Sequence, residues 1–240
     1  MRILGLIPSR MESARFPDKP LVDIHGKSMI RRVYEQAIAS EMLDEVYVVT
    51  DSNDIKAEIE RYGGKCILTS SKPRNGTERC LEAYIKLDEE FDAIINIQGD
   101  EPYIQPQQID LLADLMRDTK VNLGTLVIKD ARPEAFISKS TIKVVLNKVG
   151  HALYFSRSPI PTNAKVFYRH IGMYAYRPDT LMEIVSLAPG VLETLESLEQ
   201  LRWLENDYKI HVAETTHDSE SVDTPDDLQY ILEKYSGRNV

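Results

Sequence analysis

Apolar runs and helix-like segments alternate along the first hundred residues of the chain. Residues 2–8, 45–50, 65–69 and 91–97 are short apolar runs, typical of parallel strands buried on both faces. Between them, residues 27–40, 54–62 and 78–87 carry apolar side chains at helical spacing, and Gly63-Gly64 suits a left-handed helix end. This βαβαβαβ order predicts an α/β fold with a doubly wound, mostly parallel central sheet and right-handed crossovers.

The pattern changes after residue 120. Residues 121–128, 141–146, 153–155 and 167–176 have the pattern of strands without regular intervening helices, which predicts a mixed or antiparallel excursion. Helical periodicity returns at 181–187 and at 192–206, a strand is expected at 209–213, and Thr224 or Asp223 is expected to cap a last helix with Pro225 in its first turn. We therefore expect a single domain over residues 1–240 with an inserted subdomain over about residues 130–177.

Composition excludes several classes of protein. The 240 residues are 42% hydrophobic, enough for a sizeable core, and 29 basic against 38 acidic residues give a net charge of −9. That charge argues against nucleic acid and anionic membranes as partners. No apolar run approaches a membrane span, and the run that ends at Pro8 is too short for a signal peptide. Cys66 and Cys80 lack metal-type spacing. We expect a soluble cytoplasmic protein.

A basic loop at residues 8–21 follows the first predicted strand. It places Arg10, Arg15 and Lys19 between three prolines, in a chain that is acidic overall. Ligands of parallel sheets bind outside the carboxyl ends of the strands, so these cations are placed to converge on one polyanion such as a triphosphate. A solvated basic loop is the alternative interpretation.

Two aspartates are candidates for a metal site. Asp100 follows the strand at 91–97 and would face the same crevice as the basic loop. Mg²⁺ usually takes one or two protein carboxylates and completes its shell with phosphate oxygens and water. Asp223 is the second candidate, whereas Asp226 and Asp227 are expected to interact with the dipole of the last helix. Alternatively, Asp100 only ends the strand in a turn that Pro102 enforces.

The basic loop belongs to a series of blocks found together in one known family. After PSRMESARFPDKPL at 8–21, seven further blocks follow in order: NGTER at 75–79, NIQGDEP at 96–102, KVV at 143–145, ALYFSR at 152–157, RHIGMYAYR at 169–177, LESLEQLRWLE at 195–205 and VDTPDDL at 222–228. With these blocks the sequence resembles the 3-deoxy-manno-octulosonate (Kdo) cytidylyltransferases, which make CMP-Kdo for lipopolysaccharide from CTP and a 2-keto sugar acid.

The resemblance implies roles for particular residues. Arg10, Lys19, Asp100 and Asp223 would form the catalytic set, with Arg10 and Lys19 on the triphosphate of CTP and both aspartates on Mg²⁺. Arg15 would assist the triphosphate contacts. The residues placed around cytosine and ribose are Ser9, Asn75, Gly76 and Thr77, and those placed around the acidic sugar are Gln98, Arg157, His170, Tyr174, Glu199 and Gln200.

The residues assigned to the sugar have simpler alternatives. His170 lies in a strand whose side chains alternate between two faces, where a lone histidine is commonly structural. Glu199 and Gln200 lie on a helix with an apolar face. The alternative for both is that they bind no ligand and lie on the exposed side of this helix. That helix, or the antiparallel excursion, also suits an interface between two copies of the chain, and we expect a homodimer.

Two departures from the family pattern leave the substrate open. Asp18 stands where the usual signature has glycine, and the connection at 158–166 is shorter than its counterpart. A variant sugar such as 8-amino-Kdo is one interpretation.

Two other functions remain as alternatives. A metal-dependent glycosyltransferase normally carries Asp-x-Asp where this chain has Gln98-Gly99-Asp100, and a nucleotide-binding protein without catalysis would tolerate an acidic residue beside Lys19.

Overall fold

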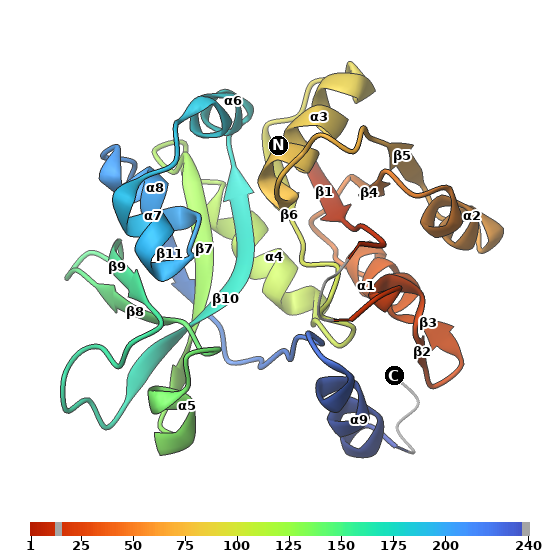
Figure 1. Cartoon of the computed structure of the whole chain (residues 1–240). Helices are drawn as coiled ribbons and strands as arrows, with labels where there is room; N and C mark the ends of the chain where they lie inside the picture. The colour runs from red at the N-terminus through yellow and green to blue at the C-terminus, as the bar shows by residue number, and fades with distance from the viewer. Residues whose placement is uncertain (13–15, 237–240) are drawn as a thin grey trace.

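The computed structural model describes residues 1–12 and 16–236, and within them a single large sheet forms the centre of the molecule (Figure 1). Its main path runs in the spatial order β11 (His211–Glu214), β7 (Leu123–Asp130), β10 (Phe167–Tyr176), β6 (Ala93–Asn96), β1 (Ile3–Pro8), β4 (Glu45–Thr50) and β5 (Cys66–Leu68). Strand β10 runs antiparallel to both of its neighbours, and the other pairings on this path are parallel. The expected mostly parallel sheet is confirmed.

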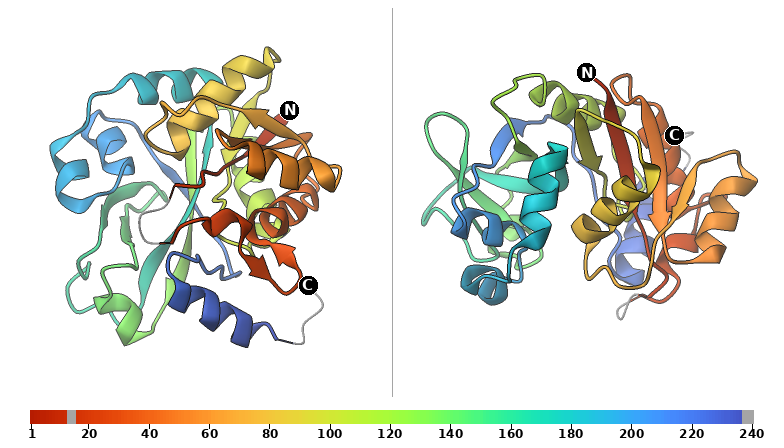
Figure 2. Two further views of the ribbon diagram at one scale, coloured as in Figure 1. Left: turned by 45° about the vertical axis from the view of Figure 1, so that its right-hand side comes forward. Right: turned by 90° about the horizontal axis from the view of Figure 1, so that it is seen from above.

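Helices cover both faces of this sheet (Figure 2). On one face, α1 (Met29–Ile38), α2 (Asn53–Arg61) and α4 (Pro106–Leu115) bury their apolar sides against the strands. On the other face, α3 (Gly76–Leu87), α6 (Pro178–Ser186) and α8 (Gln200–Glu205) do the same. Alternate side chains of β1 and β10 enter opposite clusters, as the alternation along a strand requires. The two apolar clusters make this a doubly wound α/β fold.

Local sequence signals set the ends of several helices. The hydroxyl of Ser52 accepts a hydrogen bond from the backbone of Ile55 at the start of α2. At the other end, Gly63 has a φ of 78° and its N–H donates to the carbonyl of Glu60, which confirms the expected glycine end. The last helix, α9 (Pro225–Lys234), begins with a capping box between Thr224 and Asp227. Thr224, rather than Asp223, is therefore its cap.

The region expected as an inserted subdomain stays attached to the sheet. It holds α5 (Pro133–Ile137) and the hairpin of β8 (Lys143–Leu146) and β9 (Ala152–Ser156). Strand β8 pairs with the first half of β10, antiparallel as the excursion predicted. In Figure 1 this hairpin projects beside the lower part of β7 and β10.

Sequence patterns missed one helix and wrongly joined two others. Helix α4 was not predicted, although Ile109, Leu112 and Met116 stand at helical spacing after Pro106 and are all buried. The periodic stretch 192–206 is not one helix, because Ser197, with φ of 53°, breaks it into α7 (Val191–Glu196) and α8. The break turns the chain so that Leu195 is exposed while Leu198 and Leu201 are buried. Periodicity alone carries no information about such a break.

The C-terminal helix returns to the beginning of the chain. Helix α9 packs through Ile231 against Ile24 and Met29, near the short elements η1 (Lys19–Leu21), β2 (Asp23–Ile24) and β3 (Lys27–Ser28). The rings of Tyr103 and Tyr235 stack with their centroids 3.7 Å apart. This docking brings the segment before α9 to the loop that follows β1. Over the described part of the chain, no helix has the length and apolar character needed to cross a membrane.

Candidate active site

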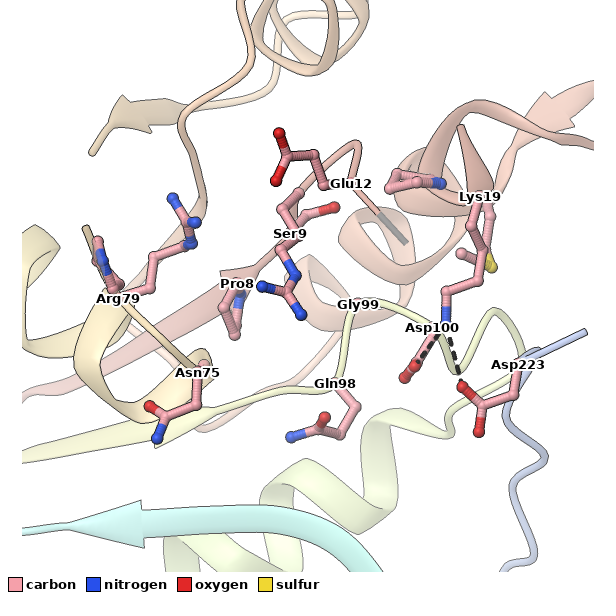
Figure 3. A pocket seen from close by; sticks show the side chains of 15 residues that line it. Pro8, Ser9, Glu12, Lys19, Asn75, Arg79, Gln98, Gly99, Asp100 and Asp223 are labelled. Carbon is pink, nitrogen blue, oxygen red and sulfur yellow. Dashed lines mark hydrogen bonds and ion pairs between the residues drawn. The ribbon is translucent and has the colours of Figure 1, made fainter. Parts of the chain in front are cut away.

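A cavity of about 420 Å³ opens at the carboxyl ends of β1 and β6 (Figure 3). This is the edge at which ligands of parallel sheets bind. The cavity is lined by residues from five separate segments: Pro8, Ser9, Arg10, Glu12, Lys19, Pro20, Met29, Pro73, Asn75, Gly76, Arg79, Gln98, Gly99, Asp100 and Asp223. Eight residues predicted from the sequence therefore share one cavity, namely Ser9, Arg10, Lys19, Asn75, Gly76, Gln98, Asp100 and Asp223.

One cation joins the two predicted carboxylates. The Nζ atom of Lys19 lies 2.9 Å from Oδ2 of Asp100 and 3.4 Å from Oδ1 of Asp223 (Figure 3). Lys19 is mostly covered, with 13% of its side chain exposed, whereas the carboxylates of Asp100 and Asp223 are 29% and 40% exposed. Both side chains thus remain partly exposed at the cavity while they contact the ammonium of Lys19.

Close approach between two loops fixes the position of Asp100. A Cβ atom at Gly99 would lie 2.8 Å from the carbonyl oxygen of Pro8, a distance that no ordinary side chain tolerates. Glycine at this position lets the loop after β6 contact the end of β1. As a result, Asp100 faces the loop that carries Lys19.

The start of α3 is connected to the start of α8, which packs on the same face of the sheet. Asn75 caps α3 through its Oδ1 atom, and its Nδ2 atom donates to Oε1 of Glu199 at 2.9 Å. The hydroxyl of Thr77 donates to Oε2 of Glu199 at 2.8 Å. Burial raises the pKa of Glu199 to about 7, and the Thr77 hydrogen bond opposes this rise. Glu199 therefore contacts residues assigned to the nucleotide, although it was predicted to contact the sugar.

The other residues assigned to the sugar lie behind the cavity. Gln98 lines the cavity and donates through Nε2 to the carbonyl of Gly172 at 2.8 Å, in the middle of β10. His170 and Tyr174 flank that glycine and are buried, with ring centroids 5.3 Å apart. Burial, with the charge of Arg169, lowers the pKa of His170 to about 3, so its ring is neutral. Gln200 is also buried, and the expected surface alternative for it is wrong.

Arg157 is held by backbone carbonyls. Its guanidinium donates to the carbonyl oxygens of Glu196 and Lys139, each at 2.9 Å, and to that of Ser197 at 3.3 Å. It lies outside the lining of the cavity, as do Thr77, His170, Tyr174, Glu199 and Gln200. Arg157 therefore connects β9 to the break between α7 and α8.

Comparisons with known proteins agree with this geometry. A family model described as "Cytidylyltransferase" matches residues 4–210. The 3-deoxy-manno-octulosonate cytidylyltransferase of Cytophaga hutchinsonii is 48% identical over 94% of both chains, and that of Thermodesulfovibrio yellowstonii is 45% identical over 98% of both. The chain belongs to the 3-deoxy-manno-octulosonate cytidylyltransferase family. As a member of this family, the chain is a nucleotidyltransferase.

Solved structures support the same family. The structure of a CMP:2-keto-3-deoxy-manno-octonic acid synthetase complexed with CTP superimposes with a TM-score of 0.91 at 38% identity, covering 98% of this chain and 99% of that one. A 4-diphosphocytidyl-2C-methyl-D-erythritol synthase from Anaerococcus prevotii has a TM-score of 0.67 at 15% identity, which shows a common fold alone.

Prediction from the sequence missed two charged residues of this cytidylyltransferase cavity. Arg79 is buried and belongs to the NGTER block, whose first three residues alone received roles. Its guanidinium donates to the hydroxyl of Thr69 and pairs with Asp51 at 3.4 Å, so it also fixes the loop that follows β5. Glu12 also lines the cavity, and Figure 3 shows its carboxylate beside Ser9. Its place within the basic loop was the available signal. Arg15 lies outside the described residues.

The residues present fit a magnesium ion held by a cytidylyltransferase. Asp100 and Asp223 offer hard oxygen ligands that already surround one positive charge. Within residues 1–12 and 16–236, no cluster of three or more histidine, cysteine, aspartate or glutamate side chains is arranged to hold a metal. Two carboxylates without further protein ligands suit Mg²⁺, because that ion commonly completes its shell with substrate phosphates and water.

Proposed function

We propose that this protein transfers CMP from CTP to the anomeric hydroxyl of Kdo, or of a close 2-keto-3-deoxy sugar acid, and releases pyrophosphate. The observation that carries the proposal is the meeting of Arg10, Lys19, Asp100 and Asp223 in one cavity beside Asn75. Cations and carboxylates from distant parts of the chain are there arranged around a space suited to a magnesium nucleotide. The names of the relatives support CTP and Kdo as the substrates.

The reaction requires mainly positioning and positive charge. The sugar hydroxyl forms a bond to the α-phosphorus while the bond from that phosphorus to the pyrophosphate oxygen breaks on the opposite side. Arg10 and Lys19 would bind the triphosphate and offset the negative charge that develops on the leaving group. Asn75 and the backbone near Ser9 and Gly76 would contact the nucleoside, because they line the neighbouring wall of the cavity.

Asp100 and Asp223 would hold Mg²⁺. When bound, the ion would lower the pKa of the sugar hydroxyl and neutralise phosphate charge, so that the chemistry needs no strong protein base. The two aspartates would also orient Lys19 toward the cavity, since its ammonium lies between them.

The biological setting forms part of the same proposal. A CMP-activated Kdo serves lipopolysaccharide biosynthesis, and we propose the cytoplasm as the site of action, where Cys66 and Cys80 would remain the free thiols that the structure shows. We also propose a homodimer. Its support is a group of exposed apolar side chains on the β8–β9 hairpin and the nearby α5 and α7, namely Ile137, Val149, Leu153, Val191 and Leu195.

The decisive experiment measures pyrophosphate and CMP-sugar together. The protein is incubated with CTP, Mg²⁺ and one of several 2-keto sugar acids, including Kdo and 8-amino-Kdo, and both products are quantified. We expect equal amounts of pyrophosphate and CMP-sugar, with the highest kcat/KM for Kdo, and no product after chelation of divalent ions. Absence of pyrophosphate with every sugar acid would overturn the proposal.

The same assay separates the alternatives. A metal-dependent glycosyltransferase would release a nucleotide from a nucleotide-sugar donor and would not form pyrophosphate from CTP. A nucleotide-binding protein without catalysis would bind CTP in calorimetry but would form neither product. The variant Asp100→Asn controls for contaminating activity, because it keeps the size of the side chain and removes the charge next to Lys19.

A further inference from the structure

A buried polar network lies directly behind the two candidate metal ligands. Asp100 lines the cavity, whereas the next residue, Glu101, points into the interior and is 8% exposed. Gln108 on α4 and Ser219 in the segment before α9 are buried next to it. None of these three residues lines the cavity, so none has a role in the function proposed above.

The network joins the loop after β6 to the segment that carries Asp223. The hydroxyl of Ser219 donates to Oε2 of Glu101 at 2.6 Å. The Nε2 atom of Gln108 donates to the carbonyl of His217 at 3.1 Å and contacts the Ser219 hydroxyl at 3.4 Å. Buried polar groups are costly to leave unpaired, so these bonds hold the segment firmly against the loop.

A backbone contact completes the connection. The N–H of Val222 donates to the carbonyl of Asp100 at 2.9 Å, directly before Asp223. Asp100 and Glu101 therefore contact the same distant segment, one through its backbone and the other through its side chain. The distance between the carboxylates of Asp100 and Asp223 therefore depends in part on this contact, beside the docking of α9 and the ion pairs with Lys19.

We propose that Glu101 is a positioning residue for the metal site, and that its hydrogen bond from Ser219 holds Asp223 against Asp100. The inference rests on the proposed function, since it assumes a divalent ion on these two aspartates. Partners behind metal ligands typically change metal affinity by about 10–100-fold when they are removed. Loss of the Ser219 hydroxyl would leave the Glu101 carboxyl without this partner and allow the segment before α9 to shift.

The test measures metal binding without turnover. Mn²⁺ serves as the probe, and its dissociation constant is measured by electron paramagnetic resonance on the full chain with CTP and without sugar. For Ser219→Ala we expect a dissociation constant about tenfold higher or more. Gln108→Met removes another contact of the same network and should also weaken Mn²⁺ binding. Unchanged Mn²⁺ affinity in both folded variants would overturn the inference.

Two further variants identify the cause of the change. Glu101→Gln keeps an oxygen that accepts from Ser219, so its Mn²⁺ dissociation constant should stay within about threefold of the wild type, less than 1 kcal/mol. If Glu101→Gln weakens Mn²⁺ binding as much as Ser219→Ala does, the weaker binding comes from loss of the carboxyl charge, and the positioning role is overturned. Ser40→Ala is the matched control, because Ser40 donates to Asp110 at 2.5 Å and is 8% exposed, yet it does not line the cavity. Its Mn²⁺ affinity should not change.

The ligand variants separate failure of this inference from failure of the proposed function. If Asp100→Asn and Asp223→Asn lose Mn²⁺ while Ser219→Ala keeps it, the metal site stands and the positioning role of Glu101 is wrong. If Asp100→Asn and Asp223→Asn bind Mn²⁺ like the wild type, the metal assignment in the proposed function is wrong, and the inference falls with it.

Discussion

Asp18 occupies a left-handed backbone position, with φ of 55°, directly before Lys19. Glycine is the usual residue in that conformation, and aspartate is among the few others that adopt it routinely. The departure from the family glycine thus has a backbone explanation. Asp18 is exposed and does not line the cavity, whereas the Lys19 ammonium contacts Asp100 and Asp223.

Substitutions at Asp18 should therefore affect stability more than catalysis. Asp18→Gly should leave the KM for CTP within about twofold, a change below 0.5 kcal/mol. Asp18→Ala should lower the free energy of unfolding by about 1 kcal/mol. The left-handed backbone conformation is unfavourable for alanine, which has no polar side chain to offset this cost by local hydrogen bonds. Urea denaturation and steady-state kinetics test both. A KM several-fold lower in Asp18→Gly would instead mean that Asp18 weakens the charge of Lys19.

At the scale of elements, Glu199 connects the start of α8 with the start of α3 through Asn75 and Thr77. The charge of Arg202 lowers the pKa of Glu199, whereas the charges of Glu193 and Glu78 raise it. Because its pKa rises from 4.5 to about 7 on folding, the folded chain binds the proton more tightly than the unfolded chain. The contribution of Glu199 to stability therefore decreases as the pH rises from about 4.5 to 7, and stays constant above that.

The variant Glu199→Gln should lose this pH dependence. Relative to the wild type, its free energy of unfolding should increase by about 1–3 kcal/mol between pH 4.5 and pH 8. Urea denaturation at several pH values measures the difference in free energy of unfolding between the two proteins. Taking the difference removes contributions that both proteins share. One of these comes from Glu101, because burial raises its pKa to about 7 as well. Glu41→Gln, at an exposed position, is the control. A constant difference between Glu199→Gln and wild type would mean that Glu199 is ionised throughout this range.

At the scale of the whole molecule, the cavity joins the two ends of the chain. Lys19 and Asp223 are 204 positions apart, and α9 packs on the short elements that follow the basic loop. A ligand that contacts both ends should therefore bind the folded chain and have no comparable site on the unfolded chain. Such a ligand stabilises the fold by mass action.

CTP with Mg²⁺ should raise the melting temperature. At about 100 times the dissociation constant the gain is about 2.7 kcal/mol, which corresponds to roughly 5–10 °C for a domain of this size. Asp223→Asn should reduce the increase seen with CTP and Mg²⁺ together, and Mg²⁺ alone should have little effect. Differential scanning calorimetry tests this prediction. An equal increase in wild type and Asp223→Asn would contradict a role for Asp223 in nucleotide binding.

The sequence by itself determined most of the elements, although not α4 or the break between α7 and α8, and much of the chemistry that they carry. Apolar runs identified the strands, and the cap residues Thr224 and Gly63 marked helix ends, because these signals depend on residues close together in the chain. The basic loop and Asp100 were placed correctly at strand ends, since the carboxyl edge of a parallel sheet follows from the strand order. Asp223 was already the second candidate for the metal, but periodicity alone would not have paired it with Lys19, and the family resemblance supplied that pairing.

Only the tertiary structure decided which groups meet. It placed Lys19 between Asp100 and Asp223, joined Glu199 to Asn75, and left Arg157 bound to carbonyls beside α7. It also buried Glu101 and Ser219 together, although nothing in their local sequence distinguishes them from surface residues. The physical reason is that contacts across more than a hundred residues depend on how both faces of the sheet are packed, and local hydrophobic patterns do not encode that arrangement.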